Sequence, residues 1–524
     1  SICFELWLTK QRAFMMTNDV DLFIIGGGVN GAGIARDAAG RGLSVILCEK
    51  DDLAEGTSSR SGKLIHGGLR YLEYYEFRLV REALIEREVL LNAAPHIIWP
   101  LRFVLPHSPK DRPAWLVRFG LFIYDHLGGR KRLPGTRTLD LRRAPEGASI
   151  KSEYTKGFEY SDCWVDDARL VVLNAVDAHE KGAEVLPRTS CTSLRQEKGQ
   201  WLATVAAEGS GETREIRAKA VVNASGPWVN DVIGRVAGTN SNRSVKLVKG
   251  SHIIVPKFWD GQQAYLVQNH DKRVIFINPY EGDKALIGTT DIAYEGDPND
   301  VCVDQSEVTY LIDAVSRYFK IALKPDDVIG SFSGVRPLFD DGNGNPSAVT
   351  RDYVLDFDQS RGAPILNIFG GKITTYRKLA EHAVQKLKPV FPQMGGNWTT
   401  NAPLPGGDMV DADFDIFLDK VRADYYWLPR DLSMHYARLY GTRITHIIGN
   451  ASTMNDLGKQ YGPLLFEAEL VYLMRHEWAR CSKDVLDRRT KHGLTVRPNE
   501  MLLIDEWFKD ALRHKDVNLF SDNY

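Results

Sequence analysis

Three glycines near the N-terminus are spaced so that the backbone around them could bind a pyrophosphate. Gly26, Gly28 and Gly31 form a G-x-G-x-x-G motif. Gly26 permits a sharp turn, Gly28 lets the backbone approach a pyrophosphate without an intervening Cβ, and Gly31 lets a helix lie close to a sheet. Glu49 ends the next apolar run, where a carboxylate can accept hydrogen bonds from a ribose 2′-OH and would repel a 2′-phosphate. These residues predict a site for a dinucleotide other than NADP.

The elements around this motif are those that a dinucleotide-binding βαβ unit needs. Leu22 to Ile25 and Leu43 to Cys48 are short apolar runs, each typical of a buried parallel strand. Small residues follow the third glycine, and the free N–H groups at the helix start attract a pyrophosphate. A bare G-x-G-x-x-G is weak evidence, because glycine clusters also form ordinary turns. Here the strands, the spacing and the terminal acid agree.

The polar loop after Glu49 carries hydroxyl and cationic groups that could surround the same cofactor. A solvated loop is the plainer alternative, because serine and glycine clusters form loops anyway. The position of the loop directly after the ribose-binding acid favours a second layer of cofactor contacts. The expected contacts are Lys50, Thr57, Ser58, Ser61, Lys63 and His66, with Arg70 as a further cationic donor.

Two later strand ends favour FAD over a nicotinamide cofactor. Ala218 to Val222 leads into small residues and then a helix start, as in the second dinucleotide contact of FAD enzymes. Ile365 to Phe369 leads into a glycine pair and a helix that is expected to reach about Leu387, whose N-terminus would stabilise negative charge on a reduced flavin. The first motif is followed by a long charged helix, Tyr74 to Asn92, instead of further βα repeats. Further FAD contacts are expected at Ala224, Gly226, Gly371, Lys372, Ile373 and Thr374.

The length and composition indicate a globular chain of several domains. The 524 residues exceed what a single core accommodates, and 43% apolar with 26% charged residues is ordinary for such a protein. Val245 to Arg336 is rich in short strands and predicts an antiparallel wall over a flavin. The proline- and glycine-rich stretch 392–405 precedes a helix-like region, which we expect to be a cap or an oligomerisation module that would permit a homodimer.

The expected fold class is α/β (α+β overall): a Rossmann-like FAD-binding domain with an antiparallel-sheet substrate domain and a C-terminal helical domain. An N-terminal extension is expected over residues 1–18, without a role in the fold. The oxidoreductase domain is expected over 19–395, with FAD-binding parts at about 19–92, 157–240 and 345–395 and substrate-domain parts at about 93–156 and 241–344. The helical cap is expected over 396–524.

Charge and cysteine content exclude several functions. With 66 basic against 68 acidic residues, the chain offers no global reason to bind nucleic acid. The 6 cysteines are scattered and never form C-x-x-C, which argues against a disulfide framework, structural zinc and an iron–sulfur cluster. We therefore expect reduced thiols in a cytoplasmic protein and no metal site.

Two segments could contact a lipid surface, although no apolar run is long enough to span a bilayer. Trp115 to Tyr124 is apolar with arginines and a lysine around it, which fits an interfacial helix and equally a buried core helix. Tyr376 to Lys388 is basic and amphipathic, although packing on the flavin domain is the favoured interpretation there.

Three stretches together resemble the FAD-dependent glycerol-3-phosphate dehydrogenases of the aerobic, respiratory kind. They are IGGGVNGAGIARDAAGRG (25–42), SGKLIHGGLRYLE (61–73) and FGGKITTYRKLA (369–380), supported by GFEYSDCWVDDARL (157–170). The resemblance implies oxidation of sn-glycerol 3-phosphate to dihydroxyacetone phosphate, with electrons passing through FAD to membrane quinone. It also implies a cytoplasmic enzyme bound peripherally to the inner face of the cell membrane. The cysteine-rich C-terminal region of the anaerobic relatives is absent, which favours the aerobic branch.

The resemblance also assigns roles to individual residues. His252 matches the family's candidate base for the hydroxyl proton, and a histidine titrates in the useful range. The remaining positions match anion-binding residues of the family, which are expected to converge on the substrate phosphate. They are Arg70, Tyr71, Arg336, Arg351 and Lys372. The catalytic set is thus His252 with Arg70, Arg336 and Lys372.

Two alternatives stay open at this point. A soluble glycerol-3-phosphate oxidase would keep the substrate site and pass electrons to O₂. A flavin-bound scaffold or sensor would bind a partner through its C-terminal helices, but it would have no need of a base together with several phosphate-binding cations.

Overall fold

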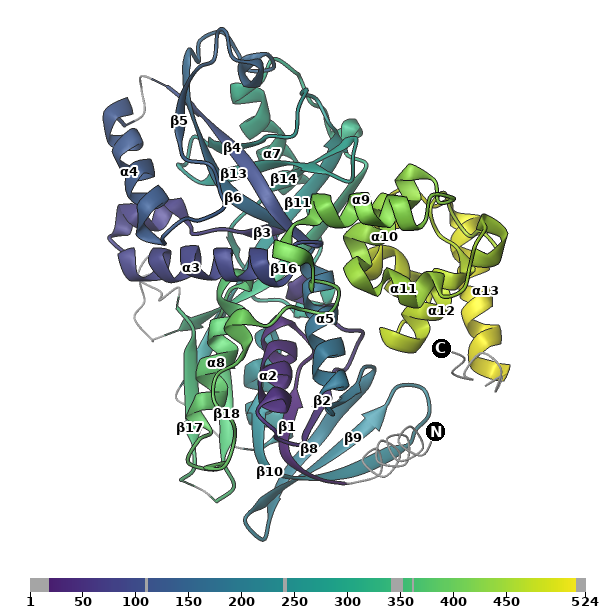
Figure 1. Ribbon diagram of the computed structural model, residues 1–524. Coiled ribbons are helices and arrows are strands. Elements are labelled where there is room, and N and C mark those ends of the chain that lie inside the picture. The colour runs from purple at the N-terminus through teal and green to yellow at the C-terminus, as the bar shows by residue number, and fades with distance from the viewer. Residues whose placement is uncertain (1–17, 109–111, 239–242, 341–351, 361, 515–524) are drawn as a thin grey trace.

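The computed structural model describes residues 18–108, 112–238, 243–340, 352–360 and 362–514. Within them the chain forms two β-sheets and a helical C-terminal domain beside them (Figure 1). The predicted fold class is confirmed in this architecture. The predicted N-terminal extension and Arg351 lie outside the described residues, apart from Asn18.

The first sheet carries the glycine motif. Its path runs β17–β18–β10–β1–β2–β7, with β8 and β9 attached beside β10. The pairs around β1 are parallel, and side chains from both of its faces are buried, which explains the apolar run in the sequence. The strands are β1 (Asp19–Ile25), β2 (Val45–Cys48), β7 (Glu184–Leu186), β8 (Thr189–Glu197), β9 (Gln200–Ala207), β10 (Thr213–Asn223), β17 (Val354–Asp358) and β18 (Ile365–Phe369).

Three helices cover one face of this sheet. Helix α2 (Val29–Gly40) lies between α5 (Asp167–Glu180) and α8 (Tyr376–Lys386). The small residues of α2 allow this packing, since a Cβ on Gly33 would lie 2.8 Å from the Tyr376 ring. The other face is covered by the β8–β9–β10 meander and by the short helix α6 (Val229–Asp231) with the turn after it.

The second sheet forms the wall of the site. Its path runs β15–β11–β14–β13–β12–β4–β6–β3, with β16 on β11 and β5 on β6. It is antiparallel except where β12 runs parallel to β4. The strands are β3 (Leu64–Ile65), β4 (Ile98–His107), β5 (Arg137–Asp140), β6 (Lys156–Val165), β11 (Ser244–Pro256), β12 (Ala264–Gln268), β13 (Val274–Tyr280), β14 (Lys284–Gly288), β15 (Ile292–Ala293) and β16 (Gly330–Asp340).

Helices cover both faces of the second sheet. Helices α3 (Phe77–Ala93) and α4 (Ala114–Leu127) cover one face, and α7 (Gln305–Tyr318) covers the other. The strand-rich pattern of residues 245–336 did not predict α7. A capping box starts this helix: Asp304 accepts a hydrogen bond from the Glu307 N–H, and the Glu307 carboxylate accepts one from the Asp304 N–H. That D-x-x-E spacing was the available signal.

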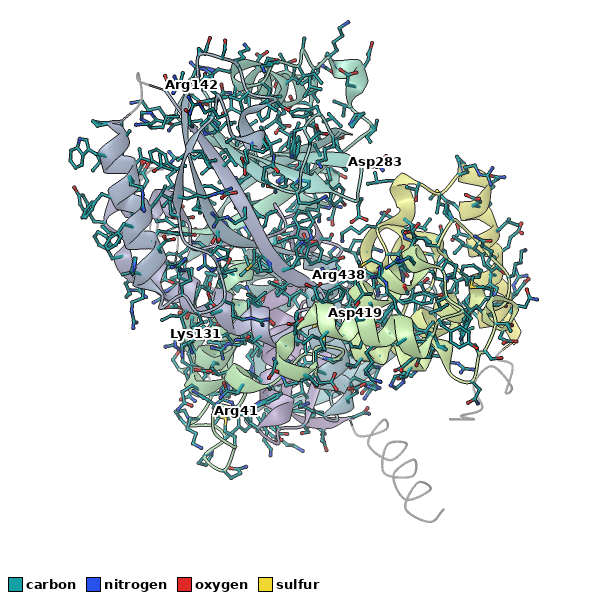
Figure 2. The ribbon with its side chains drawn as sticks, turned by 45° about the horizontal axis from the view of Figure 1, so that its top comes forward. Arg41, Lys131, Arg142, Asp283, Asp419 and Arg438 are labelled. Atoms are coloured by element: carbon teal, nitrogen blue, oxygen red, sulfur yellow. The ribbon has the colours of Figure 1, made fainter. Side chains whose placement is uncertain are left out.

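The C-terminal domain is helical, as expected, and is attached through buried polar contacts. Arg438 of α10 donates to the Pro95 carbonyl at 3.3 Å and lies over the Trp99 and Phe414 rings, at the junction seen in Figure 2. Arg169 of α5 pairs with Glu477, and Arg489 with Asp52. The helices are α9 (Phe414–Asp424), α10 (Arg430–Tyr440), α11 (Ile444–Ile448), α12 (Glu467–His476) and α13 (Pro498–His514).

Candidate active site

The glycine turn has the shape that the motif predicted. Gly26 has φ +112°, and a Cβ there would lie 2.5 Å from the Ala224 carbonyl oxygen. A Cβ on Gly31 would lie 1.8 Å from the Gly26 oxygen, so α2 can approach β1 only with glycine at this position. The Ser58 hydroxyl accepts a hydrogen bond from the Val29 N–H at 3.0 Å. The first turn of α2 thus lies next to the second-layer loop, as predicted.

Glu49 accepts hydrogen bonds from one backbone N–H group of the glycine turn and one of the loop that follows β2. Its carboxylate accepts from Gly27 at 2.7 Å and from Asp51 at 2.9 Å. Burial raises the pKa of this carboxyl, and the two N–H donors oppose that rise. Each carboxylate oxygen can accept a second hydrogen bond. A ribose contact is compatible with this arrangement and stays a prediction.

Some side chains of this loop are taken up by hydrogen bonds within the protein, whereas others could still donate to a cofactor. Lys63 is 2% exposed, and its ammonium donates to both Asp167 oxygens and to the Ser59 carbonyl, at 2.8 to 3.0 Å. An ammonium has three protons, and these three acceptors use all of them. In this structure the Lys63 side chain therefore holds the loop to Asp167 and has no proton left to donate to a phosphate. Ser61 donates to the same Asp167, and Thr57 to the Val335 carbonyl.

Lys50 is only partly engaged. Its ammonium lies 4.5 Å from the centre of the Trp228 ring and donates to Asp51 and to Asn299. Gly226, two positions before that tryptophan, has φ +56° at the start of the turn that follows β10. The strand end predicted around Ala224 therefore lies beside the glycine turn, as the FAD assignment requires.

The second glycine pair closes the cofactor site from the other side. Gly370 and Gly371 have φ +76° and +103°, and the Asn30 amide donates to the Gly370 carbonyl at 3.2 Å. A Cβ on Gly371 would lie 3.0 Å from that amide, and the Asn30 Oδ1 is buried without a hydrogen-bond partner among the described residues. A glycine-lined cradle with an unpaired acceptor fits a bound flavin dinucleotide.

The helix expected at Gly371 begins later. A 3-10 turn at Ile373–Thr375 comes first, and α8 begins at Tyr376. Thr374 does not cap α8: its hydroxyl accepts from the His66 N–H at 3.2 Å and so ties the two cofactor loops together. The His66 ring packs edge-on against Phe276, and burial lowers its pKa.

His252 lies on β11 in a setting that keeps it neutral. The ring stacks on Phe332 at 4.9 Å between centroids. It also lies over Gly288, the paired residue on the neighbouring strand β14, where a Cβ would clash with it. Burial is the main cause that lowers its pKa, to about 3, and the positive charges of Lys63 and Arg336 add to it. A neutral imidazole can accept a proton, but this pKa makes His252 a weaker base than an ordinary histidine. Its role as base stays a prediction.

Four of the expected anion-binding residues lie in the described part of the chain, on β16 and in the segments before α3 and after β18. Arg336 of β16, the strand next to β11, donates to Asp291 at 2.9 Å and to the Thr290 carbonyl. The Lys372 ammonium lies 4.1 Å from the centre of the Tyr71 ring, and Arg70 reaches the Tyr74 hydroxyl at 3.4 Å. Convergence of these groups on one phosphate stays a prediction.

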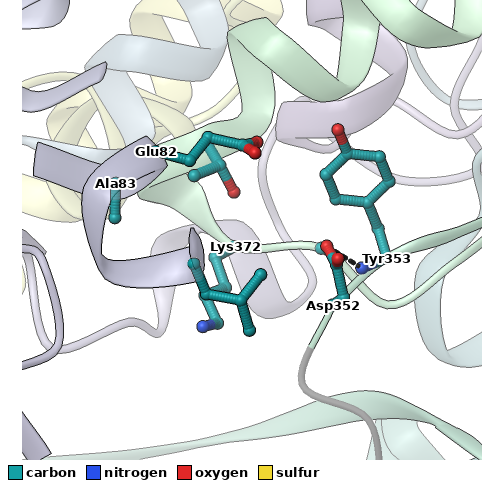
Figure 3. Close-up of a pocket in the computed structure, with 8 residues that line it drawn as sticks. Glu82, Ala83, Asp352, Tyr353 and Lys372 are labelled. Carbon is teal, nitrogen blue, oxygen red and sulfur yellow. Dashed lines mark hydrogen bonds between the residues drawn. The ribbon is translucent and has the colours of Figure 1, made fainter. Parts of the chain in front are cut away.

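Lys372 also borders a small cavity that the sequence did not predict. Its volume is about 20 Å³, and Figure 3 shows Lys372 with Glu82 and Ala83 of α3 on one side and Asp352 and Tyr353 on the other. Burial and the negative charge of Asp352 raise the pKa of Glu82. No pattern in the sequence pointed to these carboxylates, because they come from segments far apart.

The two candidate lipid segments have different surroundings. On α4, Trp115, Phe119 and Phe122 are 71%, 55% and 50% exposed and border a shallow hollow with Arg118, while Leu121 faces the core. On α8, the apolar side chains are buried against α2. Packing is thus the correct interpretation for α8. Among the described residues, no helix has the length and apolar character needed to cross a bilayer.

Comparison with known proteins identifies two matching families. Residues 21–377 match the family described as FAD dependent oxidoreductase, and residues 397–503 match the C-terminal domain of alpha-glycerophosphate oxidase. The chain is 67% identical over 491 residues to D-erythritol 1-phosphate dehydrogenase of Brucella abortus, covering 94% of this chain and 98% of that protein. It is 50% identical over 496 residues to aerobic glycerol-3-phosphate dehydrogenase of Escherichia coli, with the same two coverages.

A solved structure agrees with the fold. The glycerol-3-phosphate dehydrogenase from Bacillus halodurans, complexed with FAD, superposes with a TM-score of 0.76 at 28% sequence identity. The superposition covers 98% of this chain and 93% of that one, and therefore includes both sheets and the C-terminal helices.

Proposed function

The chain belongs to the family of FAD-dependent oxidoreductases and has FAD as its cofactor, and from this premise we propose that it is a dehydrogenase of a short phosphorylated polyol. We propose D-erythritol 1-phosphate as the preferred substrate, because the relative of that name shares 67% of its residues with this chain. Glycerol 3-phosphate is the second candidate, supported by the relatives at 50% identity and by the motifs that resemble that family.

The observation that carries the proposal is a buried histidine on β11 beside the strand β16, which carries Arg336. His252 Nε2 faces Gly62, where no side chain intervenes, and can accept the hydroxyl proton of the substrate. Bound FAD would supply the hydride acceptor for the carbon that bears this hydroxyl, so that the alcohol would become a ketone. Arg336 lies close enough to lower the pKa of His252 and would hold the phosphate, with Arg70 and Lys372 as further cations.

The acceptor that we propose is membrane quinone. The exposed apolar face of α4 supports this, since the apolar side chains of Trp115, Phe119 and Phe122 could enter the lipid boundary while Arg118 meets anionic headgroups. Tyr75 is also exposed and lies at the end of the 3-10 turn 69–74, which contacts α4. We therefore propose a peripheral protein on the inner face of the cell membrane; a homodimer stays a prediction.

Steady-state assays with both phosphates test the substrate. We expect reduction of a quinone analogue with each, and a higher kcat/KM for D-erythritol 1-phosphate. A higher value for glycerol 3-phosphate would reverse the order of the two candidates. Rapid peroxide formation with little quinone reduction would replace the dehydrogenase with an oxidase.

Vesicle co-sedimentation tests the membrane surface. We expect binding to vesicles that contain anionic lipid, weakened by salt, and strong loss of binding when the three α4 aromatics are changed to serine together. The matched control is Tyr426→Ser, which removes an aromatic side chain that is 85% exposed on the C-terminal domain. Equal binding by all three proteins would rule out α4 as the lipid contact.

A further inference from the structure

Asn278 of β13 is a buried amide whose oxygen lacks a partner. The residue is 1% exposed, and its Oδ1 has no hydrogen-bond partner among the described residues. Its Nδ2 donates to the Gly62 carbonyl at 3.4 Å, which is a long hydrogen bond. A buried acceptor without a partner is costly and rare in folded proteins, so a structural role alone does not explain the amide.

The strand register places Asn278 on the same face of the sheet as His252. Gly288 of the intervening strand β14 pairs with His252 on one side and with Phe276 on the other. Two residues along β13 from Phe276, Asn278 points to the same face, since side chains alternate along a strand. In this second row Asn278 pairs with Leu286, which in turn pairs with Ile254. Asn278 is thus the polar member of an otherwise apolar row next to the histidine.

Gly62 touches both residues. Its carbonyl accepts from Asn278, and a Cβ on Gly62 would lie 3.6 Å from His252 Nε2. Because glycine has no side chain, only backbone lies between the imidazole nitrogen and the amide at this point. A substrate whose hydroxyl meets His252 Nε2 would therefore extend toward Asn278 without meeting a side chain of this loop.

We propose that Asn278 Oδ1 accepts a hydrogen bond from a substrate hydroxyl beyond the oxidised carbon and thereby selects a four-carbon polyol phosphate over a three-carbon one. The inference rests on the proposed function and names its specificity-determining residue. With the carbon next to the phosphomethyl group oxidised, glycerol 3-phosphate has one hydroxyl left, whereas D-erythritol 1-phosphate has two. A site that hydrogen-bonds a hydroxyl discriminates strongly against a substrate without it, because the protein group is then left unpaired.

Asn278→Leu tests the inference on the FAD-loaded enzyme. Leucine has the same branched shape and no acceptor, so kcat/KM for D-erythritol 1-phosphate should fall about tenfold, while that for glycerol 3-phosphate should stay within about twofold. Asn278→Ser, which is too short to reach the hydroxyl, should give the same change in selectivity if the leucine variant folds poorly. The matched control is Leu286→Met, a volume-conserving change at the paired position, which should leave the ratio of the two values unchanged.

Three results would overturn the inference. An equal loss with both substrates, together with a changed flavin absorption spectrum, would mean that the amide serves the cofactor. An unchanged selectivity ratio in both Asn278 variants would mean that it contacts no distinguishing hydroxyl. Oxidation of glycerol 3-phosphate alone by the unaltered enzyme would refute the role of Asn278 and leave a polyol-phosphate dehydrogenase, whereas inactivity with both phosphates would refute the proposed function itself.

Discussion

Replacing Arg169 with methionine should loosen the C-terminal domain from the flavin domain. Arg169 and Glu477 are both 0% exposed, and the guanidinium binds both carboxylate oxygens and donates twice to the Leu439 carbonyl, at 2.8 and 3.1 Å. After the change, the nearest cation to Glu477 is Arg489, whose Nε is 3.9 Å away. A buried carboxylate that loses its partner costs about 3–5 kcal/mol of folding free energy.

Urea unfolding of the FAD-loaded protein measures this cost. The midpoint of the transition that releases the C-terminal domain should fall by the amount that corresponds to about 3–5 kcal/mol at an unchanged slope. The double variant Arg169→Met/Glu477→Leu should recover most of the loss, because it removes both charges and leaves apolar side chains. Lys420→Met, which breaks an exposed pair with Asp424, is the control and should leave the midpoint in place. A double variant as unstable as the single one would refute the reasoning.

Three further predictions follow from the charged groups. His252→Ala should lower kcat about 10²–10⁴-fold with FAD still bound, and in the unaltered enzyme His252 should cause no loss of kcat/KM between pH 9 and 5, because its pKa is about 3. Arg336→Ala should raise KM for the phosphorylated polyol, whereas Arg142→Ala, at an exposed pair with Asp140, should not; equal values for the two would remove Arg336 from the phosphate site. The pKa of Asp52 is lowered to about 2 by Arg489 and Arg488 against burial, so this group should contribute about 2 kcal/mol above pH 4 that is lost as the pH falls to 2. The difference in the free energy of unfolding between Asp52→Asn and the unaltered protein should therefore become smaller from pH 4 to pH 2. A difference that stays constant over this range would contradict the lowered pKa of Asp52.

The sequence predicted the parts of the site that depend on local backbone geometry. Gly26 and Gly371 adopt the positive φ values that only glycine tolerates without strain, and such positions can be recognised from spacing and neighbouring strands. The apolar run of β1 and the helical character of the C-terminal region were predictable for the same reason, since both follow from short-range patterns.

The misses depend on partners that are distant along the chain. Lys63 was expected to donate to a phosphate because of its place in the loop, but its ammonium forms an ion pair with Asp167, more than 100 residues later in the sequence. For α4 the sequence left burial and lipid contact equally open, and for α8 it favoured packing. The fold shows that α8 packs on α2 while the aromatic side chains of α4 stay exposed. The unpaired amide of Asn278 lies in an ordinary strand sequence, and its significance depends on the register of three strands.

Anaerobic titration of the flavin absorbance tests the central claim most directly. Adding D-erythritol 1-phosphate to the oxidised, FAD-loaded protein without any acceptor should bleach the flavin band, and glycerol 3-phosphate should bleach it more slowly. Erythritol and glycerol without phosphate should have no effect at the same concentrations, because the proposed cations would have no anion to bind. A flavin band that stays unchanged with both phosphates, in a protein that dithionite reduces fully, would contradict the account.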